Sequence, residues 1–126
     1  MFEPNTVAIE FTPEKYNTGK KFLKVLKEFS YTDKHGYKWT VPADYLSDGG
    51  SIPKWAQRFI GEPLEGDTLR AVLVHDVYCD NQSRSQKDTH KVFREIMKID
   101  GVGKIIRNLM YTAVVKYNKF ENPDWK

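Results

Sequence analysis

The spacing of apolar residues changes once along this chain of 126 residues, and that change narrows the choice of folds. In the first third, apolar and polar side chains alternate, which is the period of a half-buried strand. Beyond a loop at residues 44–53, apolar residues recur every three or four positions, as on the buried face of a helix. Strands followed by helices predict an α+β fold. We expect an N-terminal antiparallel hairpin or small sheet packed on a C-terminal bundle of three to four helices.

Two segments carry the strand pattern. Residues 7–11 place Val7, Ile9 and Phe11 on one side of a first strand. Residues 22–42 alternate in the same way around DKHG at 33–36, so they predict a β-hairpin with the first strand beside it. Pro42 ends the hairpin because it has no N–H to donate to a neighbouring strand.

The helical part divides into four segments. PKWAQRFI predicts a short helix that Gly61 and Pro63 stop, and a second helix follows over residues 67–80. Ser83 or Ser85 is placed to cap a third helix. The last helix is predicted over residues 102–118. Its apolar stripe comprises Val102, Ile105, Ile106, Leu109, Met110, Ala113, Val114 and Tyr117.

Composition is typical of a single folded domain spanning residues 1–126. Hydrophobic residues make up 40% of the chain, and Cys79 is its single cysteine, so no internal disulfide can form. That cysteine usage fits a reducing compartment. The sequence shows no leader and no apolar run long enough to cross a membrane, so we expect a soluble protein.

The positive charge is concentrated in the C-terminal part of the chain. Residues 84–126 hold ten Lys or Arg against five Asp or Glu, while residues 1–83 hold ten against twelve. Such a basic region could meet nucleic acid or an acidic partner. The charges are scattered along the sequence and no nucleic-acid motif accompanies them, so we interpret them as solvated helix faces and disfavour nucleic acid.

A histidine and two aspartates occupy positions that helical periodicity assigns to buried faces. LRAVLVHDVY is apolar almost all round, which predicts a helix buried on several sides and turns His75 and Asp76 inward. Asp88 lies four residues before Val92, on the apolar face of the next helix, so it is also predicted to point inward. The three side chains could therefore meet.

Three interpretations of that constellation stay open. His75 could act as a general base oriented by Asp76 or Asp88. The same three side chains could bind a divalent metal, with carboxylates favouring Mg²⁺ or Mn²⁺ and the imidazole favouring Zn²⁺. Alternatively, they form a buried hydrogen-bond network that pins the helices together.

The loop DGGSIP adds candidate groups. Gly49 and Gly50 allow backbone N–H groups to approach a ligand, and a helix start near Ser51 would favour an anion. Ser51 is a helix cap, a ligand-binding group or a nucleophile activated by His75. Asp48 is a turn residue or an acidic group of a site.

The remaining titratable candidates are assigned no functional role. His35 falls in the hairpin turn and His90 three residues from a helix start, so both are predicted to be exposed. Cys79 lacks a helix start or a neighbouring cation that would activate it, and we assign it to the core.

Three motifs in this order resemble a known family. They are D-x-x-S-x-P in DGGSIP, the pair HD followed by Tyr in HDVY, and S-R-x-x-x-D-x-x-x-x-F in SRSQKDTHKVF. Together they resemble the family of domains of unknown function numbered 1353, found largely in tailed bacteriophages and prophages, over about residues 40–118. The resemblance implies a phage context and no particular activity. The positions that it marks are Asp48, Ser51, Pro53, His75, Asp76, Tyr78, Arg84 and Asp88.

Two hypotheses about function follow, both located in the host cytoplasm or the virion. The first is a small phage hydrolase acting on a phosphoester, a peptide or a cell-wall bond, with a divalent metal as an optional cofactor. Its catalytic residues would be His75, Asp76, Asp88, Asp48 and Ser51, and its binding residues Gly49, Gly50, Tyr78 and Arg84.

The second hypothesis is a non-enzymatic virion or tail component, or a binder of a host protein. Here the same residues form a structural network, while an exposed Trp125 and the C-terminal lysines contact phage structural proteins or a host protein. An open pocket with His75 at its floor would favour the enzyme. A closed, hydrogen-bonded core would favour the structural role.

Overall fold

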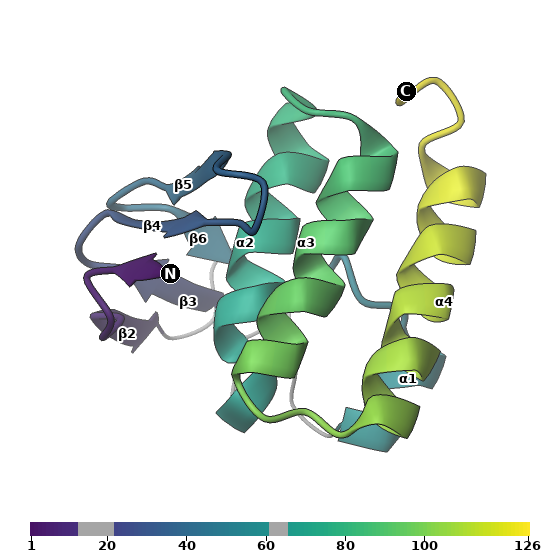
Figure 1. The fold of residues 1–126 in the computed structure, drawn as a ribbon, viewed down its shortest axis with the longest axis horizontal. Coiled ribbons are helices and arrows are strands. Elements are labelled where there is room, and N and C mark those ends of the chain that lie inside the picture. Colours follow the sequence, from purple (N-terminus) through teal and green to yellow (C-terminus); the bar gives the residue numbers. More distant parts are fainter. Residues whose placement is uncertain (13–21, 61–65) are drawn as a thin grey trace. The chain divides into compact units, whose positions relative to one another are not determined.

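A computed structural model describes residues 1–12, 22–60 and 66–126 (Figure 1). The chain divides into two compact units, Met1–Asp48 and Gly49–Lys126. In the described residues the first unit contains the strands and the second the helices, which confirms the α+β class. The prediction that residues 1–126 form one domain stays a prediction.

The strands of the first unit form two small antiparallel sheets. Their bounds are β1 Phe2–Glu3, β2 Ile9–Thr12, β3 Phe22–Val25, β4 Phe29–Thr32, β5 Lys38–Val41 and β6 Leu46–Ser47. One sheet has the order β1-β4-β5 and the other β2-β3-β6. The predicted alternation is present in part. Leu23, Val25, Phe29, Tyr31, Trp39 and Val41 are buried as expected, but Ser30 is buried as well, and Phe11 of β2 is 48% exposed.

The extent of the predicted hairpin over residues 22–42 is wrong. Only β4 and β5 form it, with Phe29 opposite Val41, while β3 belongs to the other sheet between β2 and β6. The first strand does lie beside β3, as expected. The physical reason is that period-two alternation shows which side chains face inward but not which strand is the neighbour.

Asp33 organises the turn of this hairpin. Its Oδ1 accepts hydrogen bonds from the backbone N–H groups of His35 and Tyr37, and its Oδ2 accepts one from Trp39 Nε1 at 2.9 Å. Burial raises the pKa of the Asp33 carboxyl, but these hydrogen bonds outweigh it, so the pKa is lowered overall. Gly36 completes the turn at a φ of +85°, where a side chain would be strained.

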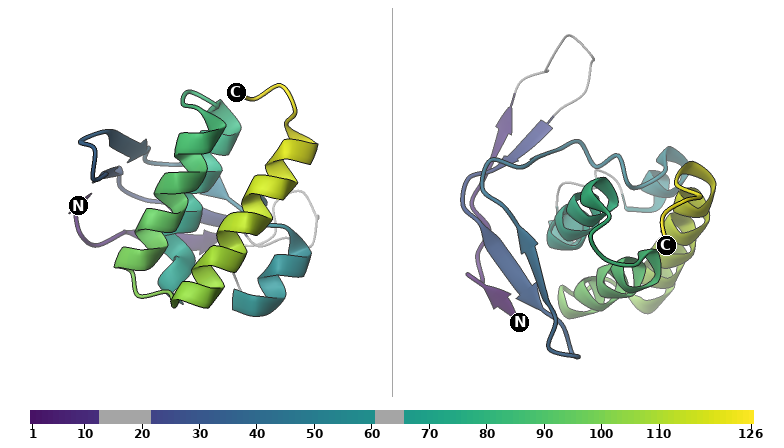
Figure 2. Two further views of the ribbon diagram at one scale, coloured as in Figure 1. Left: turned by 45° about the vertical axis from the view of Figure 1, so that its right-hand side comes forward. Right: turned by 90° about the horizontal axis from the view of Figure 1, so that it is seen from above.

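The second unit is built from helices that run beside one another (Figure 2). Their bounds are α1 Lys54–Ile60, the 3₁₀ turn η1 Gly66–Thr68, α2 Leu69–Asn81, α3 Gln86–Ile99 and α4 Lys104–Glu121. Helix α3 packs against both α2 and α4, and α4 also contacts α1. The four predicted helices are therefore confirmed, whereas Gly61 and Pro63, the proposed stop of the first, lie outside the described residues.

Two details of the helices concern the predicted cap of α3 and the predicted apolar stripe of α4. Ser85 is the cap of α3, since its Oγ accepts a hydrogen bond from the backbone N–H of Asp88. The stripe of α4 is only partly buried: Met110, Ala113 and Val114 are enclosed, but Ile105 is 83% exposed. Ile105 lies in the first turn of α4, and its position on the helix turns it away from the face that contains Met110 and Ala113.

Within the described ranges, no helix combines the length and the apolar character that crossing a membrane requires.

Candidate functional site

Helix α2 carries His75 and Asp76 into the interior of the second unit. Every residue from Ala71 to Tyr78 is buried, which follows from the apolar character of the helix on all sides. His75 has no exposed surface and Asp76 is 5% exposed. The prediction that both side chains point inward is confirmed.

His75 is hydrogen-bonded to a second histidine from the neighbouring helix. Its Nε2 lies 2.9 Å from Nδ1 of His90, on α3, and its Nδ1 lies 3.5 Å from Sγ of Cys79, one helical turn away. The ring of Phe93 packs against His75 with its centroid 4.7 Å away. These four side chains, His75, Cys79, His90 and Phe93, form what we call the histidine cluster.

Both imidazoles are held in the neutral form. Burial lowers the pKa of His75 well below its usual value, and the neighbouring His90 lowers it further. Burial also lowers the pKa of His90 to about 4. Burial, together with Asp76 and Asp80, raises the pKa of the Cys79 thiol, so the thiol stays protonated.

These protonation states allow one continuous chain of hydrogen bonds. The protonated Cys79 thiol can donate to Nδ1 of His75, and Nε2 of His75 can then donate to Nδ1 of His90. In that arrangement His90 carries its own proton on Nε2, which is buried and has no hydrogen-bond partner among the described residues. The side chains of the histidine cluster therefore bond to one another, and the N–H at Nε2 of His90 is the one group of this chain of hydrogen bonds that lacks an acceptor among the described residues.

The C-terminal segment covers this end of the chain of hydrogen bonds. Trp125 packs edge-on against the ring of His90, with the two ring centroids 5.7 Å apart. Its Nε1 donates a hydrogen bond to the carbonyl of Arg84 at 2.8 Å. The carbonyl of Trp125 accepts a hydrogen bond from Nε2 of Gln86. Trp125 is only 7% exposed, so the expectation that it forms an exposed contact is wrong. Burial of the indole is favourable because its N–H donates to a backbone carbonyl in the turn between α2 and α3.

Asp76 faces the loop before α1 rather than the imidazole of His75. Its Oδ1 accepts a hydrogen bond from the backbone N–H of Ser51 at 3.3 Å. Gly49 adopts a φ of +75° and its carbonyl accepts from the N–H of Ile52, while Gly50 is exposed. Asp76 therefore holds this loop against α2.

The expected helix start near Ser51 is wrong. Helix α1 begins at Lys54, and the N–H groups of Ala56 and Gln57 bond to the carbonyl of Pro53. Proline favours this first-turn geometry because its φ is already helical. The Oγ of Ser51 is buried and has no hydrogen-bond partner among the described residues, so no capping bond is formed there.

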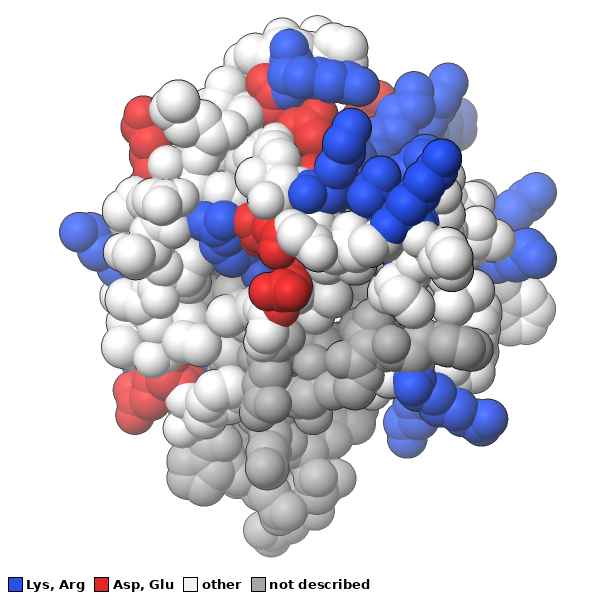
Figure 3. Space-filling model, turned by 60° about the horizontal axis from the view of Figure 1, so that its bottom comes forward, with Lys and Arg blue, Asp and Glu red and all other residues white. Residues whose placement is uncertain are grey.

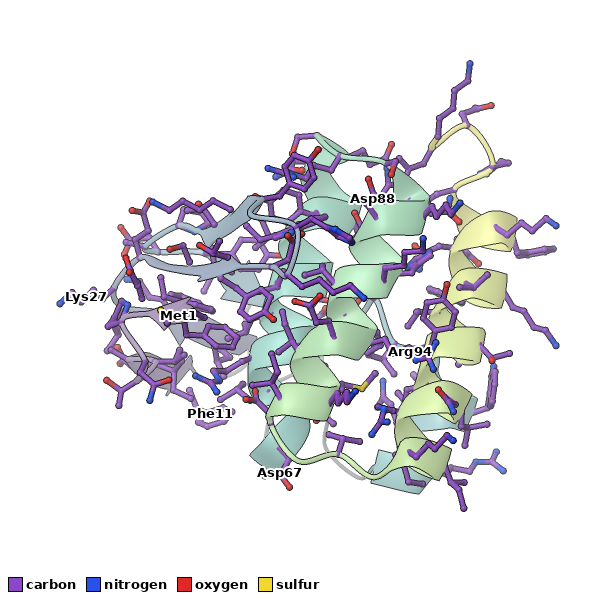
Figure 4. All side chains as sticks on the ribbon, in the orientation of Figure 1. Met1, Phe11, Lys27, Asp67, Asp88 and Arg94 are labelled. Atoms are coloured by element: carbon purple, nitrogen blue, oxygen red, sulfur yellow. The ribbon has the colours of Figure 1, made fainter. Side chains whose placement is uncertain are left out.

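Asp88 does not join the cluster. It is exposed at the first turn of α3, where Figure 4 labels it, so the prediction that it points inward is wrong. Val92 lies at one edge of the buried face of α3, and four residues turn a helix about 40° beyond a full circle. Counting back from Val92 therefore leaves the buried face instead of staying on it.

The prediction that His90 is exposed is wrong in the opposite direction. The side chain is only 2% exposed. His90, Phe93 and Met97 follow one another at spacings of three and four, which places all three on the buried face. That spacing was the signal available in the sequence.

The proposed metal ligands are not brought together. His75 contacts His90 and Cys79, Asp76 contacts Ser51, and Asp88 faces solvent. Among the described residues, no three or more His, Cys, Asp or Glu side chains form a group that could hold a metal ion. The set His75, Asp76 and Asp88 therefore does not fit a metal site in this structure.

The other positions marked by the motifs have mainly structural surroundings. Tyr78 is buried and its carbonyl accepts the N–H of Gln82, which ends α2. Arg84 lies in the turn before α3 and its carbonyl binds Trp125. Asp48 is half-buried at the end of the first unit. Their assigned catalytic and binding roles stay predictions.

Comparison with known proteins relates the chain to proteins that have no described activity. It is 38% identical over 106 residues to the uncharacterized protein y4jT of Sinorhizobium fredii, covering 84% of this chain and 30% of that protein. It is 38% identical over 103 residues to the uncharacterized protein y4iH of the same organism, covering 81% of this chain and 41% of that protein. The chain thus spans less than half the length of these curated relatives. No solved structure matches it.

The family comparison agrees with the motifs from which the site was built. Residues 23–114 match the family described as "Protein of unknown function (DUF1353)". This match contains the DGGSIP loop, helix α2 and helix α3, and hence all members of the histidine cluster. The chain therefore belongs to the DUF1353 family of proteins of unknown function.

Proposed function

We propose that this chain is a non-enzymatic binding module whose motif residues hold its helices and loop in place. The observation that carries the proposal is the closure around His75. The side chain has no exposed surface, and both ring nitrogens are engaged by His90 and Cys79. A general base must come within hydrogen-bond reach of a substrate, which this position does not offer.

The electrostatics of the cluster support the same proposal. A catalytic imidazole is commonly oriented by a carboxylate that also raises its basicity. Among the described residues, the hydrogen-bond partners of His75 are an imidazole and a thiol, and its pKa is lowered rather than raised. These are the properties of a neutral, buried structural histidine.

The family context suggests where such a module acts. The two curated relatives are longer than this chain and share it over 30% and 41% of their lengths, as expected of a module that serves in larger proteins. With the phage context that the motif resemblance implies, we propose a component of a virion or tail assembly, or a binder of a host protein.

The test separates loss of stability from loss of turnover. His75→Gln and His90→Gln should each lower the free energy of unfolding by about 2 kcal/mol, because a buried partner is left unsatisfied. Urea denaturation measures this effect, with His35→Gln as a control at an exposed histidine. The wild-type chain should not hydrolyse p-nitrophenyl phosphate, p-nitrophenyl acetate or peptidoglycan, with or without Mg²⁺, Mn²⁺ or Zn²⁺. Turnover that disappears in a folded His75→Gln variant would refute the proposal.

A second candidate function, a ligand-binding or hydrolytic site at the DGGSIP loop, is favoured by one observation. The hydroxyl of Ser51 is buried without a hydrogen-bond partner among the described residues, and such groups call for an explanation. If Ser51 serves a ligand, Ser51→Ala should abolish turnover or ligand binding with little change in stability. If it does not, Ser51→Ala should be neutral or stabilising, because it removes an unsatisfied hydroxyl.

A further inference from the structure

Four basic residues form a straight row on the outer face of α3. Lys87, Lys91, Arg94 and Lys98 follow one another at spacings of four, three and four, which places them on one side of the helix. All four are exposed, while the buried residues of α3 lie on the opposite side. The first and the last of the four are eleven positions apart, so the row is about 16 Å long.

The charges of the row are not neutralised within the described part of the chain. None of the four takes part in an ion pair there, whereas Arg70 of α2 is paired with Asp100. The acidic residues of α3, Asp88 and Glu95, lie along one side of the row instead of within it. The row is thus a continuous line of positive charge with solvent in front of it.

Helix α4 extends the basic surface on the other side. The guanidinium of Arg94 lies 5.5 Å from the centroid of the Tyr111 ring on α4. Lys104, in the first turn of α4, is exposed and Arg107 is half-buried. Figure 3 shows Lys and Arg side chains gathered in the upper right part of the face drawn there.

We propose that this row binds the phosphate backbone of a nucleic acid without regard to its sequence. The inference rests on the proposed binding function and adds a nucleic acid to the protein contacts proposed above. Exposed ion pairs between side chains contribute little each, so an acidic protein would need apolar contacts as well. The four row positions offer none. A nucleic acid instead releases condensed counterions for each phosphate that a cation neutralises, which gives measurable affinity from charge alone.

The experiment measures fluorescence anisotropy of a labelled 20-bp DNA duplex of mixed sequence with the full chain at several salt concentrations. Four phosphate contacts predict that the logarithm of the binding constant falls with the logarithm of the salt concentration at a slope of about −3.6. Between 50 and 200 mM salt, the affinity should therefore drop on the order of 100-fold.

Matched variants test whether the row is responsible. Lys91→Ala/Lys98→Ala removes two cations from the row, and should make the salt dependence less steep, lowering the magnitude of the slope by about 2. Lys54→Ala/Lys116→Ala removes the same charge from exposed positions on α1 and α4 and should leave the slope nearly unchanged. Circular dichroism checks that both variants are folded.

Three results would overturn the inference. They are an absence of DNA binding at 50 mM salt, an equal loss in both double variants, or tighter binding of poly-L-glutamate than of DNA. The last would indicate an acidic protein partner. Because the row variants leave His75 and His90 intact, failure here leaves the proposed non-enzymatic function untouched. Turnover in the substrate assays would refute that function alone.

Discussion

The burial of His75 and His90 makes the second unit sensitive to acid. Both imidazoles titrate near pH 6.5 in an unfolded chain, but burial lowers the pKa of His75 well below that and the pKa of His90 to about 4. Above pH 6.5, both imidazoles are neutral in the folded and in the unfolded chain, so they add no pH dependence to the free energy of unfolding. Between pH 6.5 and about 4, the unfolded chain binds protons that the folded chain does not, so stability falls with the pH.

The first prediction concerns the size of this loss. Each histidine can contribute a slope of up to about 1.4 kcal/mol per pH unit within that window. Urea denaturation at pH 7.5, 6.0 and 5.0 should show a falling free energy of unfolding, and His90→Gln should give a flatter dependence because one titrating group is gone. A dependence as steep in His90→Gln as in the wild type would contradict this account of the cluster.

Ser85 and Asp88, at the start of α3, should contribute differently to stability. The second prediction is that Ser85→Ala lowers stability by about 1 kcal/mol, since its Oγ satisfies the N–H of Asp88 at the helix terminus. Asp88→Asn should change stability by only a few tenths of a kcal/mol, because the exposed carboxylate acts mainly on the helix dipole. Thermal denaturation of both variants measures the difference. A larger loss in Asp88→Asn would mean that Asp88 has a buried role.

The segment after α4 acts as a cover for the histidine cluster. The third prediction is that Trp125→Ala lowers stability by about 3 kcal/mol, because it removes a buried ring and leaves the carbonyl of Arg84 without this donor. Trp125→Phe keeps an aromatic ring but loses the indole N–H, and should cost about 1 kcal/mol. Modification of His90 by diethylpyrocarbonate should become faster in Trp125→Ala than in the wild type. An unchanged rate would show that Trp125 does not control access to His90.

The two units carry reporters that should respond to acid in different ranges. Trp39 Nε1–H bonds to Asp33 in the first unit, and Trp125 Nε1–H bonds to Arg84 in the second. The pKa of Asp33 is lowered from 3.8, so its contribution to stability persists above that value and is lost only as the pH falls through the lowered pKa. The histidine cluster loses its contribution between pH 6.5 and about 4.

The fourth prediction is therefore an order of events in an acid titration followed by ¹⁵N NMR. The indole N–H signal of Trp125 should leave its native position first, and that of Trp39 should persist below pH 4. Replacing His90 with Gln should delay the change at Trp125 and leave Trp39 unaffected. Simultaneous loss of both signals in the wild type would show that the two units unfold together.

The basic residues are dispersed along the sequence but aligned on one face of α3 in the folded molecule. The basic residues between 84 and 126 are scattered in the sequence, so the sequence alone disfavours a nucleic-acid partner. On α3, the helical repeat aligns Lys87, Lys91, Arg94 and Lys98 on one exposed face. A helix rotates by about 100° per residue, so residues that look dispersed in one dimension become a line in three.

Local patterns predicted much of this protein because they depend on neighbours in the sequence. The burial of Ala71–Tyr78, the cap at Ser85 and the hairpin turn at 33–36 follow from periodicity and from the hydrogen-bonding groups within a few residues. The family motifs in the loop, α2 and α3 likewise lie within the residues that match the family model.

Contacts between distant segments could not be read in this way. His75 and His90 are fifteen positions apart, and Trp125 reaches Arg84 across 41 positions. The sequence placed an imidazole at residue 75 on a buried face, but it did not show whether its partner was a carboxylate, a metal or another imidazole. The packing of α3 on α2 determines that this partner is His90, because a buried polar atom bonds to whichever group the fold brings within about 3 Å.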